Sequence, residues 1–293
     1  MNSIAKILTC FLALFIVSAY SPIANSGVPK NLPPTGPLLP PIPTPPPTVA
    51  PTSYICANQN IPAGWVVTEV EPATGSCSPN EQYGITEIGV ANTQEQICGV
   101  PQTLPPNWVI TNVWSGGGSC ANFQPETIQN VSNYSSAWVC ANSPVPSGWV
   151  VSNVQATGGN CSQYQSYYLD KIIGAQTAIC SISPIPSGWV VTQVSPAGGD
   201  CANYSPEIID LASGAEMGIC SNSPIPMDWY IADNYPIDQN CGVFLQSIIY
   251  KIQSYNNQLY MCANSPLPSG WYVTSVQPSS DCNPYDVEVL ARS

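Results

Sequence analysis

The chain has 293 residues, with 5 Lys and Arg against 17 Asp and Glu, a formal net charge of −12 and no histidine. Nucleic acids and anionic membrane surfaces bind clusters of Lys and Arg, so this composition argues against both as partners. The absence of histidine excludes Ser-His-Asp and Cys-His catalysis. Charged residues make up only 8% of the chain, but 44% hydrophobic residues predict a folded protein rather than a disordered one.

Residues 1–26 have the features of a secretory signal peptide. Lys6 supplies the positive charge, residues 7–17 form an apolar run, and Val17-Ser18-Ala19 is a small-residue cleavage site. A membrane anchor is the alternative, but the run is shorter than the roughly 20 residues that span a bilayer. We therefore expect cleavage, a location outside the cell or on its surface, and no membrane association after the signal is removed.

Residues 27–53 are predicted to form a proline-rich linker, with clusters such as Pro45-Pro46-Pro47. Such a tract favours the extended polyproline II conformation and acts as a semi-rigid spacer. A PxxP ligand for an SH3-type groove is the alternative interpretation. For a secreted chain, a stalk that holds the following residues away from a surface fits better.

The remaining chain repeats one phrase. Its clearest copy is residues 186–192, Pro-Ser-Gly-Trp-Val-Val-Thr, preceded by Cys180 and followed by Cys201. The first cysteines of successive copies are 40 to 42 residues apart, and a fixed period of this size indicates a repeat architecture. We expect six repeats, over residues 54–97, 98–139, 140–179, 180–219, 220–261 and 262–293.

Each repeat contains two cysteines, and an even number of cysteines in a secreted chain indicates disulfides. Pairing within the repeat is favoured because every repeat then holds a complete pair. Pairing between adjacent repeats would leave one odd cysteine at each end, and the sequence alone does not exclude it. A disulfide across a loop of this size is worth about 3 kcal/mol, which a unit of about 40 residues needs to fold. The expected pairs are Cys56–Cys77, Cys98–Cys120, Cys140–Cys161, Cys180–Cys201, Cys220–Cys241 and Cys262–Cys282.

The pattern within a repeat predicts mostly β structure. A short strand leads into the first cysteine at 177–180, Pro and Gly form a turn over 183–188, and β-branched residues predict a second strand over 189–194. The last third fits a helix at 205–211 but a strand at 247–252. We favour a strand that forms a hairpin across each repeat boundary. The predicted fold is a tandem array of six small disulfide-stapled antiparallel β units.

Few residues suggest chemistry. No cofactor motif is present, and without histidine or a CxxC pair no zinc site is expected. A glycosidase-like carboxylate pair is the one remaining catalytic option. None of the acidic residues belongs to a motif, so we expect them to be solvated surface charges and the protein to be non-catalytic. The acids considered are Glu69, Glu71, Glu126, Glu207 and Asp210.

Aromatic residues are the feature that suggests binding, because exposed aromatic rings stack on sugars. The tryptophans of the repeated phrase are expected instead to form the core of their own units, each packed on its own disulfide. Trp114 and Trp138 are not repeated and are the candidates for ligand stacking. The repeated tryptophans are Trp65, Trp108, Trp149, Trp189, Trp229 and Trp271.

The phrase resembles tandem Cys-x-x-Ser-Pro-Ile-Pro-Ser-Gly-Trp-Val-Val repeats of secreted bacterial proteins, most clearly over 220–226 and 186–192. The resemblance covers residues 54–293 and implies secretion and tandem disulfide units, without a particular activity. The fifth copy departs from it at 227–231. We therefore expect a secreted or surface-displayed protein with a structural or adhesive role, whose partners are extracellular polysaccharide or other surface proteins. The alternative is a carbohydrate-binding protein that uses repeated aromatic side chains.

Overall fold

The structure, a computed structural model, describes residues 53–73, 75–89, 92–236 and 239–293. The predicted signal peptide and all of the predicted linker except Ser53 lie outside the described residues. Among the described residues, no helix is both long enough and apolar enough to cross a membrane.

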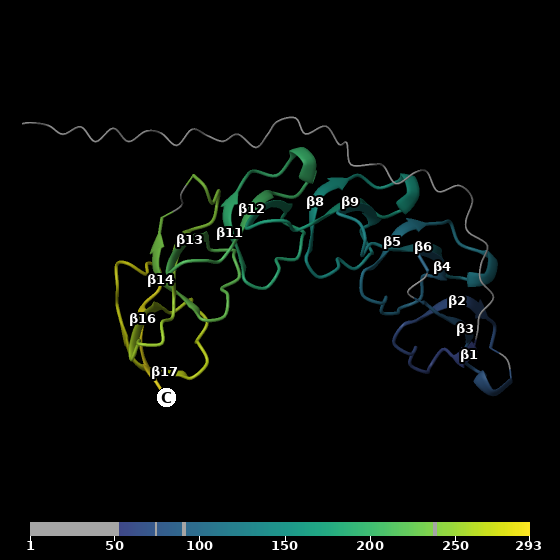
Figure 1. The fold of residues 1–293 in the computed structure, drawn as a ribbon, viewed down its shortest axis with the longest axis horizontal. Helices are drawn as coiled ribbons and strands as arrows, with labels where there is room; N and C mark the ends of the chain where they lie inside the picture. The colour runs from purple at the N-terminus through teal and green to yellow at the C-terminus, as the bar shows by residue number, and fades with distance from the viewer. Residues whose placement is uncertain (1–52, 74, 90–91, 237–238) are drawn as a thin grey trace, which may run out of the picture. The chain divides into compact units, whose positions relative to one another are not determined.

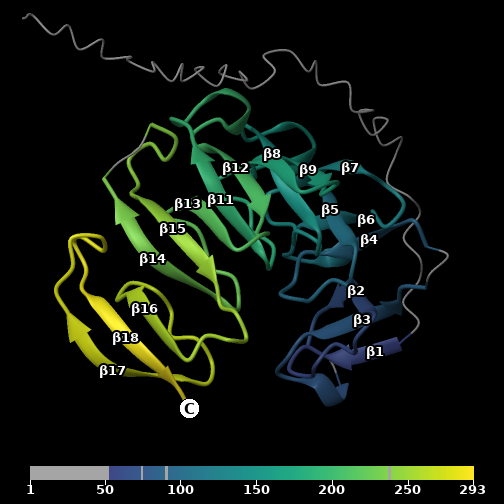
Figure 2. The same cartoon turned by 60° about the vertical axis from the view of Figure 1, so that its left-hand side comes forward.

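The described chain forms six antiparallel sheets of three strands each (Figures 1 and 2). We call these sheets, in chain order, units 1 to 6. The prediction of a tandem array of small β units is confirmed. The strands are β1 (Ser53–Cys56), β2 (Trp65–Glu71) and β3 (Gln82–Glu87) in unit 1; β4 (Gln94–Cys98), β5 (Trp108–Val113) and β6 (Pro125–Asn130) in unit 2; β7 (Ser136–Cys140), β8 (Trp149–Gln155) and β9 (Ser166–Lys171) in unit 3; β10 (Gln176–Cys180), β11 (Trp189–Val194) and β12 (Pro206–Leu211) in unit 4; β13 (Glu216–Cys220), β14 (Trp229–Tyr235) and β15 (Gln246–Lys251) in unit 5; and β16 (Gln258–Cys262), β17 (Trp271–Gln277) and β18 (Val287–Arg292) in unit 6.

The six disulfides join cysteines of the same unit, with Cα–Cα distances from 5.1 to 5.3 Å. Pairing within the repeat, the favoured of the two alternatives, is therefore what the structure has. The second cysteine ends a 3-10 turn in units 1 to 4, for example Gly199–Cys201 (η4). In each described unit, the disulfide thus ties the end of the first strand to the segment just before the third strand.

The predicted hairpin across each repeat boundary is wrong. The last third of the repeat is a strand, but it lies in the middle of its own sheet, as β15 does between β13 and β14 in Figure 2. The disulfide gives the physical reason. Cys201 is tied to Cys180 just before the third strand begins, so β12 starts beside β10, with Pro206 opposite Cys180. The central position also gives the third strand hydrogen-bond partners on both edges.

The Pro-x-Gly-Trp turn starts each second strand. In unit 4 the Trp189 N–H donates to the Pro186 carbonyl at 3.1 Å, and Gly188 has a φ of +83°. A positive φ at this position favours glycine, and asparagine or aspartate tolerate it best among other residues. The two repeats without glycine follow this rule, with Asn107 at +64° and Asp228 at +65°.

A β-bulge at the fourth residue of each second strand changes which side chains face the core. In β11 the register shifts between Val191 and Gln193, so Thr192 is the extra residue. The shift brings Val194 to the same core as Trp189 and Val191, although strict alternation would turn it away. In five units the bulged residue is Thr or Ser, whose hydroxyl donates to a carbonyl of the third strand, as Thr192 does to Ile208 at 3.4 Å.

The hydrophobic cores interlock between neighbouring units. The core of unit 4 contains Trp189, Val191 and Ile209 of that unit. The disulfide that packs in this core is Cys220–Cys241, which belongs to unit 5. The unit 4 disulfide packs in the core of unit 3 instead. The expectation that each tryptophan packs on its own disulfide is therefore wrong. A sheet of three short strands buries its apolar face only when another element covers it, and here the next stapled unit does so.

Candidate functional site

The five carboxylates considered for catalysis lie in three different units, namely units 1, 2 and 4. Glu69 and Glu71 lie on β2 beside Tyr54, whose hydroxyl donates to Glu69 at 3.1 Å. Desolvation and the charges of both carboxylates raise the pKa of Tyr54. Asp210 in unit 4 accepts hydrogen bonds from Gln176 and Thr192. Among the described residues, no three Cys, Asp and Glu side chains gather as metal ligands do.

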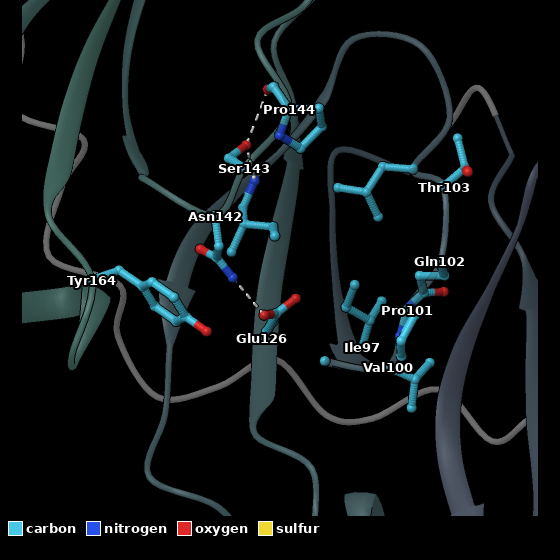
Figure 3. Close-up of a pocket in the computed structure, with 13 residues that line it drawn as sticks. Ile97, Val100, Pro101, Gln102, Thr103, Glu126, Asn142, Ser143, Pro144 and Tyr164 are labelled. Carbon is cyan, nitrogen blue, oxygen red and sulfur yellow. Dashed lines mark hydrogen bonds between the residues drawn. The ribbon is translucent and has the colours of Figure 1, made fainter. Parts of the chain in front are cut away.

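Glu126 lies at the junction of units 2 and 3, in a pocket of about 580 Å³. Figure 3 shows Asn142 directed at it, and the Asn142 Nδ2 donates to the Glu126 carboxylate at 2.8 Å. The Tyr164 ring and the Val100–Thr103 loop line the pocket on either side (Figure 3). The Asn142 Oδ1 is buried without a hydrogen-bond partner.

The same pair recurs at the junction of units 4 and 5. There the Asn222 Nδ2 donates to Glu207 at 3.0 Å, and the Asn222 Oδ1 is again buried without a partner. Glu126 is 8% exposed and Glu207 is 5% exposed, so the expectation of solvated surface charges is wrong for these two. Burial raises the pKa of both carboxyls, and the hydrogen bond from asparagine opposes the rise.

The two non-repeated tryptophans occupy different environments. Trp114 is half-buried, and its indole N–H donates to the Thr127 hydroxyl at 3.1 Å within the same unit. Trp138 is also half-buried, but its ring lies against Tyr168, with centroids 4.9 Å apart and planes tilted by 52°. Tilted contacts of this kind are favourable arrangements of two aromatic rings. Of these two tryptophans, only Trp138 belongs to an aromatic pair.

Polar groups surround this pair on the sheet face opposite the unit 3 core. Trp138 lies across from Tyr168, and Ser136 lies across from Asp170. The Tyr168 hydroxyl donates to Ser136 at 2.8 Å, and the Ser152 hydroxyl donates to Asp170. Burial raises the pKa of Asp170. We call these five residues the unit 3 aromatic face; it combines two rings with hydroxyl and carboxyl groups at a partly exposed surface.

Unit 4 has the equivalent hydroxyl–carboxyl hydrogen bond on this face but lacks the two aromatic rings. Asp210 accepts a hydrogen bond from Thr192, as Asp170 does from Ser152. The residues equivalent to Trp138 and Tyr168 are Ala178 and Ile208. The Trp138–Tyr168 pair is therefore not part of the repeat. Unit 5 has a different ring pair, Tyr230 and Tyr250, with centroids 6.2 Å apart. Sequence reasoning selected Trp138 but missed Tyr168, which only the register of β7 with β9 places opposite it.

A serine clamps each of four units to the unit before it, and sequence reasoning missed this role. The Val191 N–H on the edge of unit 4 donates to the Ser223 hydroxyl of unit 5 at 2.8 Å, and that hydroxyl donates to the Pro224 carbonyl at 3.1 Å. At the junction of units 1 and 2, the Gln102 side chain has this role and accepts a hydrogen bond from the Val67 N–H at 2.9 Å. The other clamps are Ser143, Ser183 and Ser265.

Comparisons with known proteins give no relative. No protein-family model, curated protein or solved structure matches this chain. Its function is therefore argued from its own residues: an interlocked array, a repeated buried Glu–Asn pair and one aromatic face.

Proposed function

We propose that the chain is a secreted or surface-displayed repeat protein with a structural or adhesive role. The six disulfides support a location outside the cytoplasm, because disulfides persist in oxidising compartments and are rare where thiols are kept reduced. The resemblance of the repeated phrase to tandem repeats of secreted bacterial proteins points the same way.

One observation carries the proposal: the core of a unit is completed by the disulfide of the unit after it. Units joined in this way form a continuous array in which each contacts its neighbours, as in other repeat proteins. The repeated tryptophans serve this array, since five of them are 2% to 8% exposed. The outward-facing side chains differ between units and are free to contact other surfaces.

A bead assay tests the adhesive role. Beads coated with the oxidised chain should bind cells or matrix of the producing culture, and fractionation should find the chain outside the cytoplasm. Beads coated with the reduced and alkylated chain are the control, because they carry the same composition without the folded array. Equal binding by both kinds of bead, or a chain held reduced in the cytoplasm, would contradict the proposal.

A second function, carbohydrate binding, is supported by the unit 3 aromatic face. Sugar rings pack on aromatic faces while their hydroxyls hydrogen-bond to neighbouring carboxyl and hydroxyl groups. Trp138, Tyr168, Ser136 and Asp170 provide these groups together on two adjacent strands. The binding would therefore be local to unit 3 and would not use the repeated tryptophans.

Retention on insoluble polysaccharides separates this function from the first. Trp138→Ala should reduce retention about tenfold, because it removes the apolar ring surface that a bound sugar would cover. Tyr260→Ala is the matched control: Tyr260 has the equivalent position in unit 6, is 57% exposed, and lies opposite Val289 rather than a second ring. Retention that Trp138→Ala leaves unchanged would exclude the aromatic face as the binding site.

A further inference from the structure

The outer edge of unit 6 exposes side chains whose counterparts in the other units are buried or half-buried. Tyr272, Val273 and Val276 on β17 are 51%, 39% and 56% exposed. The residues equivalent to Val273 are 0% to 6% exposed; they are Val67, Ile110, Val151, Val191 and Ile231. Within the part of the chain that the structure describes, no unit packs on β17. An uncharged strand with exposed apolar side chains at a sheet edge is a surface that another chain can cover.

Five junctions within the molecule show what covers such an edge. At all five, the following unit brings its disulfide and a Ser or Gln side chain that accepts from the edge N–H. At four of them it also brings an aromatic residue three positions after its second cysteine; Tyr285 at the fifth is 41% exposed. At the junction of units 4 and 5 these are Cys220–Cys241, Ser223 and Phe244. A partner for unit 6 should therefore present the same set of groups.

The Glu–Asn pair identifies that partner more closely. Glu126 and Glu207 have equivalent positions: each lies opposite the residue that precedes the first cysteine of its own unit. Each accepts a hydrogen bond from an asparagine of the following unit, and that asparagine lies two positions after the first cysteine of its unit. Units 1 and 3 have Tyr83 and Tyr167 at the glutamate position, and units 2 and 4, which follow them, have Val100 and Ile182 at the asparagine position. At four of the five junctions glutamate thus occurs with asparagine, and tyrosine with an aliphatic residue. The fifth junction differs: Ser247 has the glutamate position and is linked to Asn264 through the Asn234 side chain.

Unit 6 has glutamate at this position, and unit 1 has asparagine. Glu288 lies opposite Met261 as Glu126 lies opposite Ile97, and Asn58 follows Cys56 by two residues. Neither side chain hydrogen-bonds to another described residue. Gln59 follows Asn58 at the position of the clamp serine, and both are exposed. The Gln59 Oε1 accepts from the Cys56 N–H at 3.1 Å and has a second lone pair for another donor. Within the described residues, these two faces therefore match each other.

We propose that unit 6 of one molecule stacks on unit 1 of a second copy, repeating the contact between neighbouring units. The Asn58 side-chain amide of one copy donates to Glu288 of the other, and Gln59 accepts from the Val273 N–H. The Cys56–Cys77 disulfide covers Val273 and Val276, as the other five disulfides cover the equivalent residues. A head-to-tail contact joins different faces, so it extends into open chains unless its rotation closes a ring.

One residue makes this contact weaker than the junctions inside the molecule. Asn80 stands where units 2 to 6 have an aromatic residue, namely Phe123, Tyr164, Tyr204, Phe244 and Tyr285. The Phe123, Tyr164, Tyr204 and Phe244 rings pack against the core of the unit before them. With asparagine there, less apolar surface is buried, so we expect association to be reversible and dependent on concentration.

Sedimentation velocity of the purified chain over a wide concentration range tests the proposal. We expect monomers when dilute and a series that grows beyond the dimer when concentrated. Val273→Asp, which puts a charge into the contact, and Asn58→Glu, which places a second carboxylate against Glu288, should each weaken association about tenfold or more. Glu87→Lys, an exposed charge change on β3, is the control and should associate as the unchanged chain does.

Mixing the two variants gives the sharpest result. The Val273→Asp chain keeps an intact unit 1 face and the Asn58→Glu chain keeps an intact unit 6 face, so a mixture should form one dimer and stop. Asn80→Tyr in the unchanged chain should instead strengthen association.

A chain that stays monomeric at every concentration overturns the proposal. Dimers that Asn58→Glu leaves intact and that never grow would also overturn it, since they indicate pairing of β17 with β17.

Discussion

Strands β11 and β17 begin alike but differ in burial. β11 reads Trp-Val-Val-Thr and β17 reads Trp-Tyr-Val-Thr, and both begin at a Pro-x-Gly-Trp turn and bulge at the same position. Val191 in β11 is 0% exposed and Val273 in β17 is 39% exposed. Unit 5 packs on β11, whereas no described unit packs on β17. Local sequence therefore determines the strand, and the neighbouring unit determines its burial.

A unit in this protein is therefore not a complete domain. Its disulfide ties its own strands together but packs in the core of the preceding unit. Each substitution should therefore act on two units, the one that contains it and the one that it covers.

The largest effect is expected from removing an internal disulfide. Replacing both Cys220 and Cys241 with serine should cost about 2–5 kcal/mol of unfolding free energy. Because this pair packs against Trp189 and Val191, amide exchange should accelerate in unit 4 as well as in unit 5. The matched control is the double substitution at Cys56 and Cys77, which lie in none of the described core clusters. Exchange that accelerates in unit 5 alone would contradict the interlocked core.

A smaller difference is expected between equivalent valines. Val191→Ala should cost about 2 kcal/mol, because it removes buried methyl groups and leaves a cavity. Val273→Ala should change stability by less than about 0.5 kcal/mol, as exposed substitutions usually do. Urea unfolding of the dilute chain measures both values. Equal losses for the two variants would show that β17 is covered in the monomer.

Loss of one clamp should have a smaller effect again. Ser223→Ala leaves the Val191 N–H without its acceptor, at a cost of about 1–2 kcal/mol. Ser187→Ala, in the exposed turn of unit 4, removes the same hydroxyl without a junction contact and is the control. Hydrogen exchange of the Val191 amide is the measurement. If it exchanges at the same rate in both variants, the serine does not clamp the units.

The smallest effect concerns pH. Burial raises the pKa of Glu126 and Glu207 above the ordinary value of 4.5, so the folded chain holds protons that the unfolded chain releases. Their contribution to stability is fully present below pH 4.5 and is lost as the pH rises through the folded-state pKa. Glu126→Gln should flatten the dependence above pH 4.5, because it removes one of the two buried carboxyls. The raised pKa of Glu126 would be contradicted if the unfolding free energy increased with pH and the Glu126→Gln substitution abolished that increase.

Much of the fold could be predicted because it depends on local chemistry. Pro186, Gly188 and Trp189 predicted the turn and the second strand, and the cysteine spacing predicted six stapled units. The position of the third strand could not be predicted, because Ile208 and its neighbours fit a strand equally well in the centre of their own sheet or beside the next unit. The bulge at Thr192, which turns Val194 inward, also leaves no signal in a single sequence.

The candidate sites depended on contacts between units, which sequence spacing does not show. Glu126 and Asn142 are 16 residues apart in different units, and nothing local distinguishes them from surface residues. Trp138 was recognisable because it departs from the repeat, but Tyr168 became its partner only through strand register. Alignment of the repeats with one another could have shown that glutamate and asparagine occur together at two alternate junctions.

Removal of unit 6 tests most directly whether each unit is completed by the unit that follows it. In a chain that stops at Gln253, the Ile231 N–H loses the Ser265 hydroxyl and the Asn234 N–H loses the Asp281 carbonyl. We predict that hydrogen exchange at both amides accelerates strongly, while the Ile110 amide, which donates to Ser143, is unchanged. Ile231 and Asn234 amides that stay as protected as in the full chain would contradict the account.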